Sequence, residues 1–220
     1  MPFKRIFTLL FACLLANAAH SAVITTPTQT YWAVDGVALG LDVNRTDWES
    51  SFDVDLFDTS LGTLLEVRLT LWGEVGSIFE VTSNNNGART ATLNSEGEIV
   101  TDLLDVIVRP FGNFVTDPLT KGETYTSGMV VADDVFAVTY SELADLAAWM
   151  GNGTRSIGVK AEGYSYVSGA GNVESIVNTW ARAALTVSYT YESRQVPEPF
   201  PLALLGLSLL GLVAARQRKV

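Results

Sequence analysis

Apolar and polar residues alternate over several stretches of this chain. Between residues 65 and 71, Glu66, Arg68 and Thr70 separate apolar residues, and similar runs occur at 52–56, 157–162 and 185–191. A period of two places the apolar side chains on one face of a β-strand and the polar ones on the other. The apolar positions are Leu65, Val67, Leu69 and Leu71; Phe52, Val54 and Leu56; Ile157, Val159 and Ala161; and Leu185, Val187, Tyr189 and Tyr191. The pattern predicts an all-β fold, an antiparallel, jelly-roll-like β-sandwich.

Two segments depart from this alternation. Residues 84–87 read Asn-Asn-Asn-Gly, and Asn-Gly between two strand-like runs predicts a type I′ hairpin turn. Residues 141–150 have helical spacing instead, with Ser141 suited to the N-cap and Gly151 to the C′ position. We therefore expect one short helix across an open end of the sandwich. Its apolar face would consist of Leu143, Leu146, Ala147 and Met150.

The N-terminal segment has the pattern of a secretory signal peptide. Lys4 and Arg5 precede an apolar stretch at residues 6–16, which is too short to span a membrane and is followed by small residues. Cleavage after Ala18 or after Ala22 fits the sequence, and the sequence does not separate the two. We expect a signal helix within residues 1–22.

The C-terminal segment combines a proline box, an apolar stretch and a basic end. Residues 200–215 contain no charge, and as a helix they would span about 24 Å, against about 30 Å of bilayer hydrocarbon. Basic residues after the stretch favour a cytoplasmic C-terminus, which leaves the body outside the inner membrane. Hydropathy alone predicts a transmembrane helix that acts as a single-span anchor. The box is Val196, Pro197, Glu198 and Pro199, and the basic end is Arg216, Arg218 and Lys219.

This order of box, apolar stretch and basic end resembles the PEP-CTERM sorting signal of Gram-negative bacteria that make extracellular polysaccharide. The resemblance implies that an exosortase recognises Pro197, Glu198 and Pro199 and cleaves near them. The hydrophobic tail would then be removed, as it is in a GPI signal.

The body carries a second resemblance. Residues 57–75, FDTSLGTLLEVRLTLWGEV, resemble the hallmark of the choice-of-anchor E domain, with Thr59 in place of the usual proline. Residues 145–154, 171–173 and 185–192 also fit that family. This resemblance gives no catalytic activity, ligand or site residue that could be transferred to the chain. The expected organisation is a signal peptide at 1–22, a choice-of-anchor E-like domain at 23–193 and the sorting signal at 194–220.

Charge and composition exclude several classes of function. The chain has a net charge of −10; five of its 14 basic residues and one of its 24 acidic residues lie in the two terminal segments, which leaves −14 for residues 23–195. Such an acidic body argues against binding to nucleic acid or to anionic lipid. Cys13 and His20 are the only cysteine and histidine, and both lie in or beside the signal peptide. The mature body therefore has no disulfide, thiolate metal site or Ser-His-Asp triad.

Acidic pairs and tryptophans are the remaining candidates for a site. Asp133 and Asp134, with other loop carboxylates, could bind calcium, although the sequence has no D-x-[DN]-x-[DN]-G loop and no other cofactor is expected. A carboxylate pair such as Asp53 and Asp55 could serve a hydrolase. Further candidates are the pair Asp102 and Asp105, and a sugar-stacking platform made from Trp32, Trp48, Trp72, Trp149 and Trp180, of which Trp72 should face solvent.

Three functions follow from these observations. The first is an exported, non-enzymatic cell-surface or matrix protein that an exosortase processes and that associates with exopolysaccharide. The second is a carbohydrate-binding module that uses exposed aromatic residues. The third is a hydrolase with a carboxylate pair.

Overall fold

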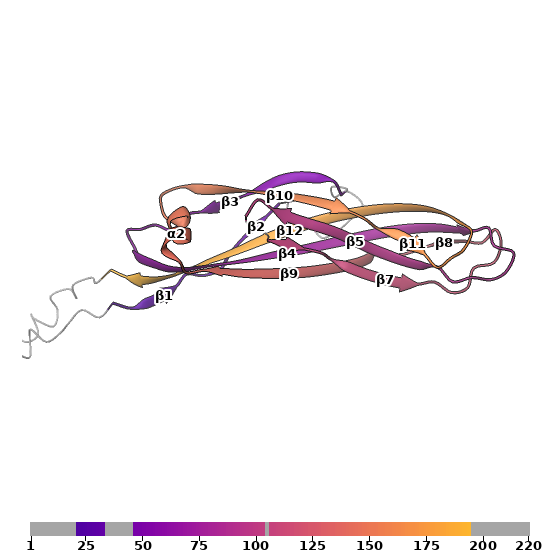
Figure 1. Ribbon diagram of the computed structural model, residues 1–220, viewed down its shortest axis with the longest axis horizontal. Helices are drawn as coiled ribbons and strands as arrows, with labels where there is room; N and C mark the ends of the chain where they lie inside the picture. The colour runs from indigo at the N-terminus through magenta and orange to yellow at the C-terminus, as the bar shows by residue number, and fades with distance from the viewer. Residues whose placement is uncertain (1–20, 34–45, 104–105, 195–220) are drawn as a thin grey trace, which may run out of the picture.

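Two antiparallel sheets stacked face to face form the body of the protein. The computed structural model describes residues 21–33, 46–103 and 106–194 (Figure 1). Sheet A contains β1 (Val23–Thr25), β2 (Gln29–Trp32), β4 (Gly62–Ser83), β8 (Thr124–Thr126), β9 (Val130–Tyr140) and β12 (Val173–Ser193). Sheet B contains β3 (Trp48–Asp55), β5 (Thr92–Thr101), β6 (Ile107–Val108), β7 (Phe111–Val115), β10 (Thr154–Gly163) and β11 (Tyr166–Ser168). The expected all-β class and antiparallel pairing are confirmed.

The central strand pair of sheet A sets the length of the described body. β4 has 22 residues and β12 has 21, and they pair antiparallel from Gly62–Ser193 at one end to Ser83–Val173 at the other. At about 3.3 Å per residue, such a strand is about 70 Å long. β1 and β2 pair with the other side of β12, while β8 and β9 pair with the other side of β4. The body is accordingly elongated along these strands (Figure 1).

Two apolar clusters lie one after the other along this axis. The larger contains the buried side chains Val67, Leu69 and Leu71 of β4 together with residues of β3, β5, β10 and β12. The smaller, at the far end, includes Phe79, Val81 and Leu93. These clusters confirm the predicted inward positions of 52, 54, 67, 69, 71, 157, 159, 161, 185, 187, 189 and 191.

A polar layer lies beside these clusters. Ser77 and Ser95 are fully buried, one from each sheet, and their hydroxyl oxygens are 2.9 Å apart. Ser77 Oγ also lies 2.7 Å from Ser165 Oγ and donates to Thr179 Oγ1 at 3.2 Å. Because buried hydroxyls are stable only when they are hydrogen-bonded, this network ties the two sheets at a fixed register.

Two residues predicted to face the core, Leu65 and Leu56, do not do so, because a strand bends at one and ends before the other. The β4–β12 register shifts between Thr190 and Tyr191, so that Tyr191 pairs with Leu64 and Leu65 has no partner. This bulge turns Leu65 outward, where it is 38% exposed, and buries Leu64 instead. Leu56 is only half-buried because β3 ends at Asp55, and Phe57 fills the core in its place.

The predicted hairpin turn at residues 84–87 is also wrong. β4 and β5 belong to different sheets, and Gly87 does not adopt a positive φ angle. The segment is a crossover between the sheets, held by Asn85. Its Nδ2 donates to the Ala170 carbonyl at 2.6 Å, and its Oδ1 accepts from the Asn172 amide at 2.8 Å.

The predicted helix is present but shorter. Helix α2 (Leu143–Leu146) continues into the 3₁₀ turn η1 (Ala147–Trp149), and Glu142 takes the N-cap position instead of Ser141. Leu146 and Trp149 are buried, whereas Leu143 and Ala147 are exposed, so the predicted apolar face is only partly correct. The Trp149 carbonyl accepts from the Phe57 amide at 2.9 Å, which fixes the helix at one end of the molecule.

Both ends of the described body lie at that same end, which we call the base (Figure 1). β1 pairs with β12 through Val23–Glu192, Ile24–Tyr191 and Thr25–Thr190. The Ser193 amide then donates to the Ala22 carbonyl at 2.8 Å, and the Arg194 amide donates to the Leu61 carbonyl at 3.1 Å. The expected signal helix and membrane helix lie outside the described residues. No helix within residues 21–33, 46–103 and 106–194 is long and apolar enough to cross a membrane.

Candidate functional site

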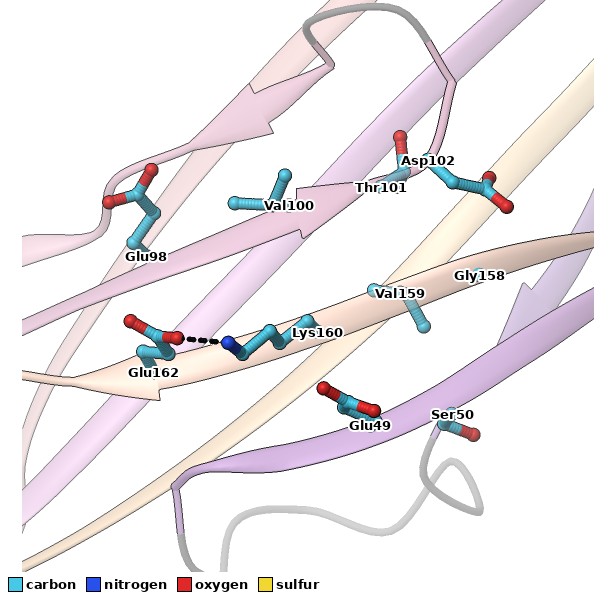
Figure 2. Close-up of a pocket in the computed structure, with 10 residues that line it drawn as sticks. All are labelled: Glu49, Ser50, Glu98, Val100, Thr101, Asp102, Gly158, Val159, Lys160 and Glu162. Atoms are coloured by element: carbon cyan, nitrogen blue, oxygen red, sulfur yellow. Dashed lines mark ion pairs between the residues drawn. The ribbon is translucent and has the colours of Figure 1, made fainter.

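An open pocket of about 540 Å³ lies on the outer face of sheet B (Figure 2). It forms where β3, β10 and β5 run side by side, with Glu49 paired to Lys160 and Lys160 paired to Val100. Gly158 leaves space in its floor, since an added Cβ would lie 3.1 Å from Asp102 Oδ2. The lining residues are Glu49, Ser50, Glu98, Val100, Thr101, Asp102, Gly158, Val159, Lys160 and Glu162.

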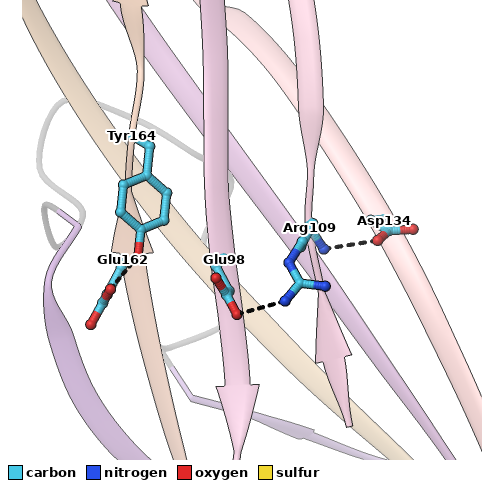
Figure 3. Close-up of polar contacts among 5 residues, drawn as sticks. All are labelled: Glu98, Arg109, Asp134, Glu162 and Tyr164. Carbon is cyan, nitrogen blue, oxygen red and sulfur yellow. Dashed lines mark hydrogen bonds and ion pairs between the residues drawn. The ribbon is translucent and has the colours of Figure 1, made fainter. Parts of the chain in front are cut away.

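Polar contacts continue from this pocket across sheet B (Figure 3). Glu162 forms an ion pair with Lys160 and accepts a hydrogen bond from the Tyr164 hydroxyl. That hydrogen bond is the main reason that the pKa of Tyr164 rises to about 12. The hydrogen bonds from Lys160 and Tyr164 lower the pKa of Glu162, and Glu162 in turn raises the pKa of Lys160. These contacts therefore stabilise the carboxylate form of Glu162, the ammonium form of Lys160 and the neutral phenol form of Tyr164.

A second set of contacts joins the sheets at their edge. Arg109 Nη2 lies 3.1 Å from Glu98 Oε1 of β5, and the Arg109 amide donates to Asp134 Oδ2 of β9 at 2.8 Å (Figure 3). The other carboxylate oxygen of Asp134 accepts from the Val135 amide at 2.8 Å. Asp134 therefore acts as a structural tie between sheet A and sheet B.

The structure corrects the loop position expected for Asp133 and Asp134. Asp133 and Asp134 lie within strand β9, not in a loop, and pair with Glu74 and Gly73 of β4. Among the residues that the structure describes, no group of three or more Asp, Glu, His or Cys side chains has a spacing suited to a metal ion. Asp102 lines the pocket, while Asp105 lies outside the described residues.

The predicted carboxylate pair lies on an open strand. Asp53 and Asp55 are exposed on β3, as expected, and neither lines the pocket. The Tyr31 hydroxyl approaches Asp55 Oδ2 at 3.4 Å and accepts from the Asp55 amide at 3.1 Å. These contacts connect β2 to β3, the other pair of sheet edges.

The five tryptophans do not form one platform. Trp149 and Trp180 are buried, and the Trp48 Nε1 donates to the Ala181 carbonyl at 3.1 Å. Trp32 is 42% exposed and packs edge-to-face on Trp72, with ring centroids 5.9 Å apart. Ala184 pairs with Trp32 on one side and Trp72 on the other, so these three residues are neighbours on the outer face of sheet A. The prediction that Trp72 lies outside the core is consistent with this position.

Sequence reasoning missed the cation that supports these two rings. The Arg182 guanidinium carbon lies 5.0 Å from the Trp72 centroid and 5.8 Å from the Trp32 centroid. Arg182 Nε also donates to Glu74 Oε1 at 2.8 Å, in a largely buried ion pair. Only the β4–β12 register brings residues 108 positions apart into this contact, so no local sequence signal could have revealed it.

Most of the predicted sorting residues lie beyond the described body. Val196, Pro197, Glu198 and Pro199, the basic end and Ala18 are outside the described residues. Ala22 lies at the base, where its amide donates to Ser193 Oγ at 3.1 Å.

Comparison with known proteins identifies a sorting motif in the C-terminal segment. Residues 195–219 match the PEP-CTERM protein-sorting motif. No curated protein matches the chain. The T=1 particle protein of infectious bursal virus is 11% identical over 84% of this chain and 48% of its own length, with a TM-score of 0.16. The VP2 subviral particle protein of infectious bursal disease virus is 13% identical over 90% of this chain and 50% of its own length, with a TM-score of 0.13.

The chain spans about half the length of these viral proteins, and such scores support no argument about fold or function. The tail match agrees with the order of box, apolar stretch and basic end. The C-terminal motif thus supports export of this protein and its sorting, as a membrane-anchored precursor, by an exosortase.

Proposed function

We propose that the protein is a non-enzymatic component of the cell surface or extracellular matrix, released from its membrane anchor by an exosortase and associated with exopolysaccharide. The observation that carries the proposal is the sorting motif at residues 195–219. The body would be a choice-of-anchor E domain, on the strength of residues 57–75.

The shape of the body is consistent with this role. Both ends of the described body lie at the base, and β4 extends from there for about 70 Å. The acidic, elongated body would project away from the membrane before release and would remain well solvated after it.

Intact-mass measurement of the protein purified from its own host tests the proposal. We expect a mature species that lacks residues 200–220, because the tail is a processing signal. Replacing Pro197, Glu198 and Pro199 with alanine should preserve membrane insertion and block processing, since two prolines hold this box extended at the membrane surface. A larger, membrane-bound form should then accumulate. A wild-type species that ends at Val220 in cells with an active exosortase would reduce the tail to an ordinary anchor.

Carbohydrate binding is the second candidate function, and one observation favours it. The exposed Trp32 and the half-buried Trp72 form an aromatic pair on the outer face of sheet A, in contact with Arg182. Aromatic faces of this kind stack on the apolar faces of sugar rings.

Affinity electrophoresis in the polysaccharide of the host tests this second function. Migration of the wild-type protein should be retarded, and Trp32→Ala should abolish the retardation. Phe111→Ala, which removes an exposed aromatic ring from sheet B, is the matched control and should remain retarded. Equal migration of all three proteins with and without polysaccharide would exclude this role.

A further inference from the structure

The base of the molecule exposes several large apolar side chains. Leu143 at the start of α2 is 78% exposed and Val23 of β1 is 67% exposed, the two highest values for large apolar residues in the described part of the chain. Leu61, in the turn between β3 and β4, is also exposed. Its carbonyl accepts from the Arg194 amide, so Leu61 lies directly beside the point where the chain leaves the body.

The sequence beyond Arg194 sets the distance from this surface to the membrane. Five residues, 195–199, separate Arg194 from the charge-free stretch at 200–215. Fully extended, five residues span at most about 18 Å. When the stretch lies in the bilayer, the base is therefore held within about 20 Å of it. No other part of the elongated body is tethered so closely.

The charges at the base determine which lipid surface suits it. Asp58, Glu142 and Glu192 are exposed there, and the exposed Arg194 beside Asp58 offsets only one of these three charges. An anionic surface would repel these carboxylates, whereas a zwitterionic surface would not, and it could still accept the apolar side chains.

We propose that the base rests on the zwitterionic surface of the membrane in the precursor, with Val23, Leu61 and Leu143 in contact with lipid. This inference rests on the anchoring role proposed for the tail. It adds that the body stands on its base, so that the crossover at residues 84–87 is the part most distant from the membrane.

Lipid quenching of a fluorophore on the full chain tests the inference. Cys13→Ser leaves no native cysteine, so Leu61→Cys, Leu143→Cys or Gly87→Cys each introduces one labelling site. Gly87 is the matched control because it is exposed at the far end and an added Cβ there meets no atom within 4 Å. Each labelled chain is reconstituted in phosphatidylcholine vesicles with or without spin-labelled phosphatidylcholine. Thermal unfolding first confirms that the three variants are folded alike.

We expect quenching and a blue-shifted emission at positions 61 and 143, and neither effect at position 87. Replacing part of the phosphatidylcholine with phosphatidylglycerol should reduce the quenching. Chains that float with the vesicles but show no quenching at 61 or 143 would overturn the inference and leave the anchor intact. Chains that fail to float with the vesicles would overturn both this inference and the anchoring role proposed for the tail. Stronger quenching in phosphatidylglycerol would contradict the assigned lipid preference.

Discussion

Neighbouring residues in β4 occupy opposite environments. Leu69 is fully buried within the row that contains Val67 and Leu71, while Thr70 faces outward between Thr186 and Ala137. Leu69→Asp should unfold the body, because an unpaired buried charge costs several kcal/mol against a typical total stability of about 5–15 kcal/mol. Thr70→Asp should be mild. Urea unfolding of both variants measures the difference, and equal damage would mean that the assigned faces are wrong.

Tyr164 offers a second prediction at the scale of one residue. Its pKa is raised to about 12 by the hydrogen bond to Glu162, so the folded protein retains the phenol proton more strongly than the unfolded chain. Any stability that this contributes is fully present below about pH 10, the unfolded pKa, and disappears as the pH rises towards 12. Glu162→Gln should lower the Tyr164 pKa towards 10. Absorbance titration of the phenolate, with Tyr164→Phe to identify its signal, measures the change.

The pairing of β4 and β12 at the base leaves no room for a side chain at position 62. Gly62 pairs with Ser193, and a Cβ at position 62 would overlap the Glu192 carbonyl. Because the carbonyl belongs to the backbone and the backbone also fixes the position of the Cβ, neither atom can move aside by a rotamer change. The two strands would have to separate there.

Gly62→Ala should therefore destabilise the protein by about 1–3 kcal/mol, the usual cost of overpacking. Gly87→Ala should have little effect, since a Cβ at that position meets open space. Thermal unfolding of the two variants tests this pair. A melting temperature for Gly62→Ala equal to that of the wild type would show that the β4–β12 contact at the base is loose enough to admit a methyl group.

The whole body should fold without either terminal segment. A fragment of residues 23–193 contains both apolar clusters and no cysteine, so we expect a soluble, β-rich monomer that needs no reductant. A far-UV spectrum dominated by helix would contradict this.

Extending that fragment to begin at Ala19 should raise its stability modestly. Ser21 and Ala22 then remain to hydrogen-bond with Glu192 and Ser193 at the base. Each such bond contributes about 1 kcal/mol or less at an exposed site. Comparing the urea midpoints of the two fragments measures the contribution. The same comparison shows what cleavage after Ala18, in place of Ala22, would preserve.

Sequence alone determined the features that depend on local pattern. Period-two alternation identified the strands and most of their buried positions, because burial of one strand face requires that spacing whatever the topology. The sorting motif was also readable, since its order along the chain is itself the signal. The lack of histidine and cysteine in the body excluded several kinds of site on composition alone, because no arrangement of the strands can supply a missing imidazole or thiolate.

Only the tertiary structure determined the features that depend on contacts between residues far apart in the sequence. The Asn-Gly pair became a crossover because β5 pairs in sheet B with β10, a choice that residues 84–87 do not encode. The bulge at Leu65 arises from the register with β12. The helix exposed Leu143 and buried Trp149, since its orientation follows from the Phe57 contact more than from its own periodicity. Likewise, only the stacking and pairing of strands separated the exposed Trp32 from the buried Trp180 and placed both ends of the described body at the base.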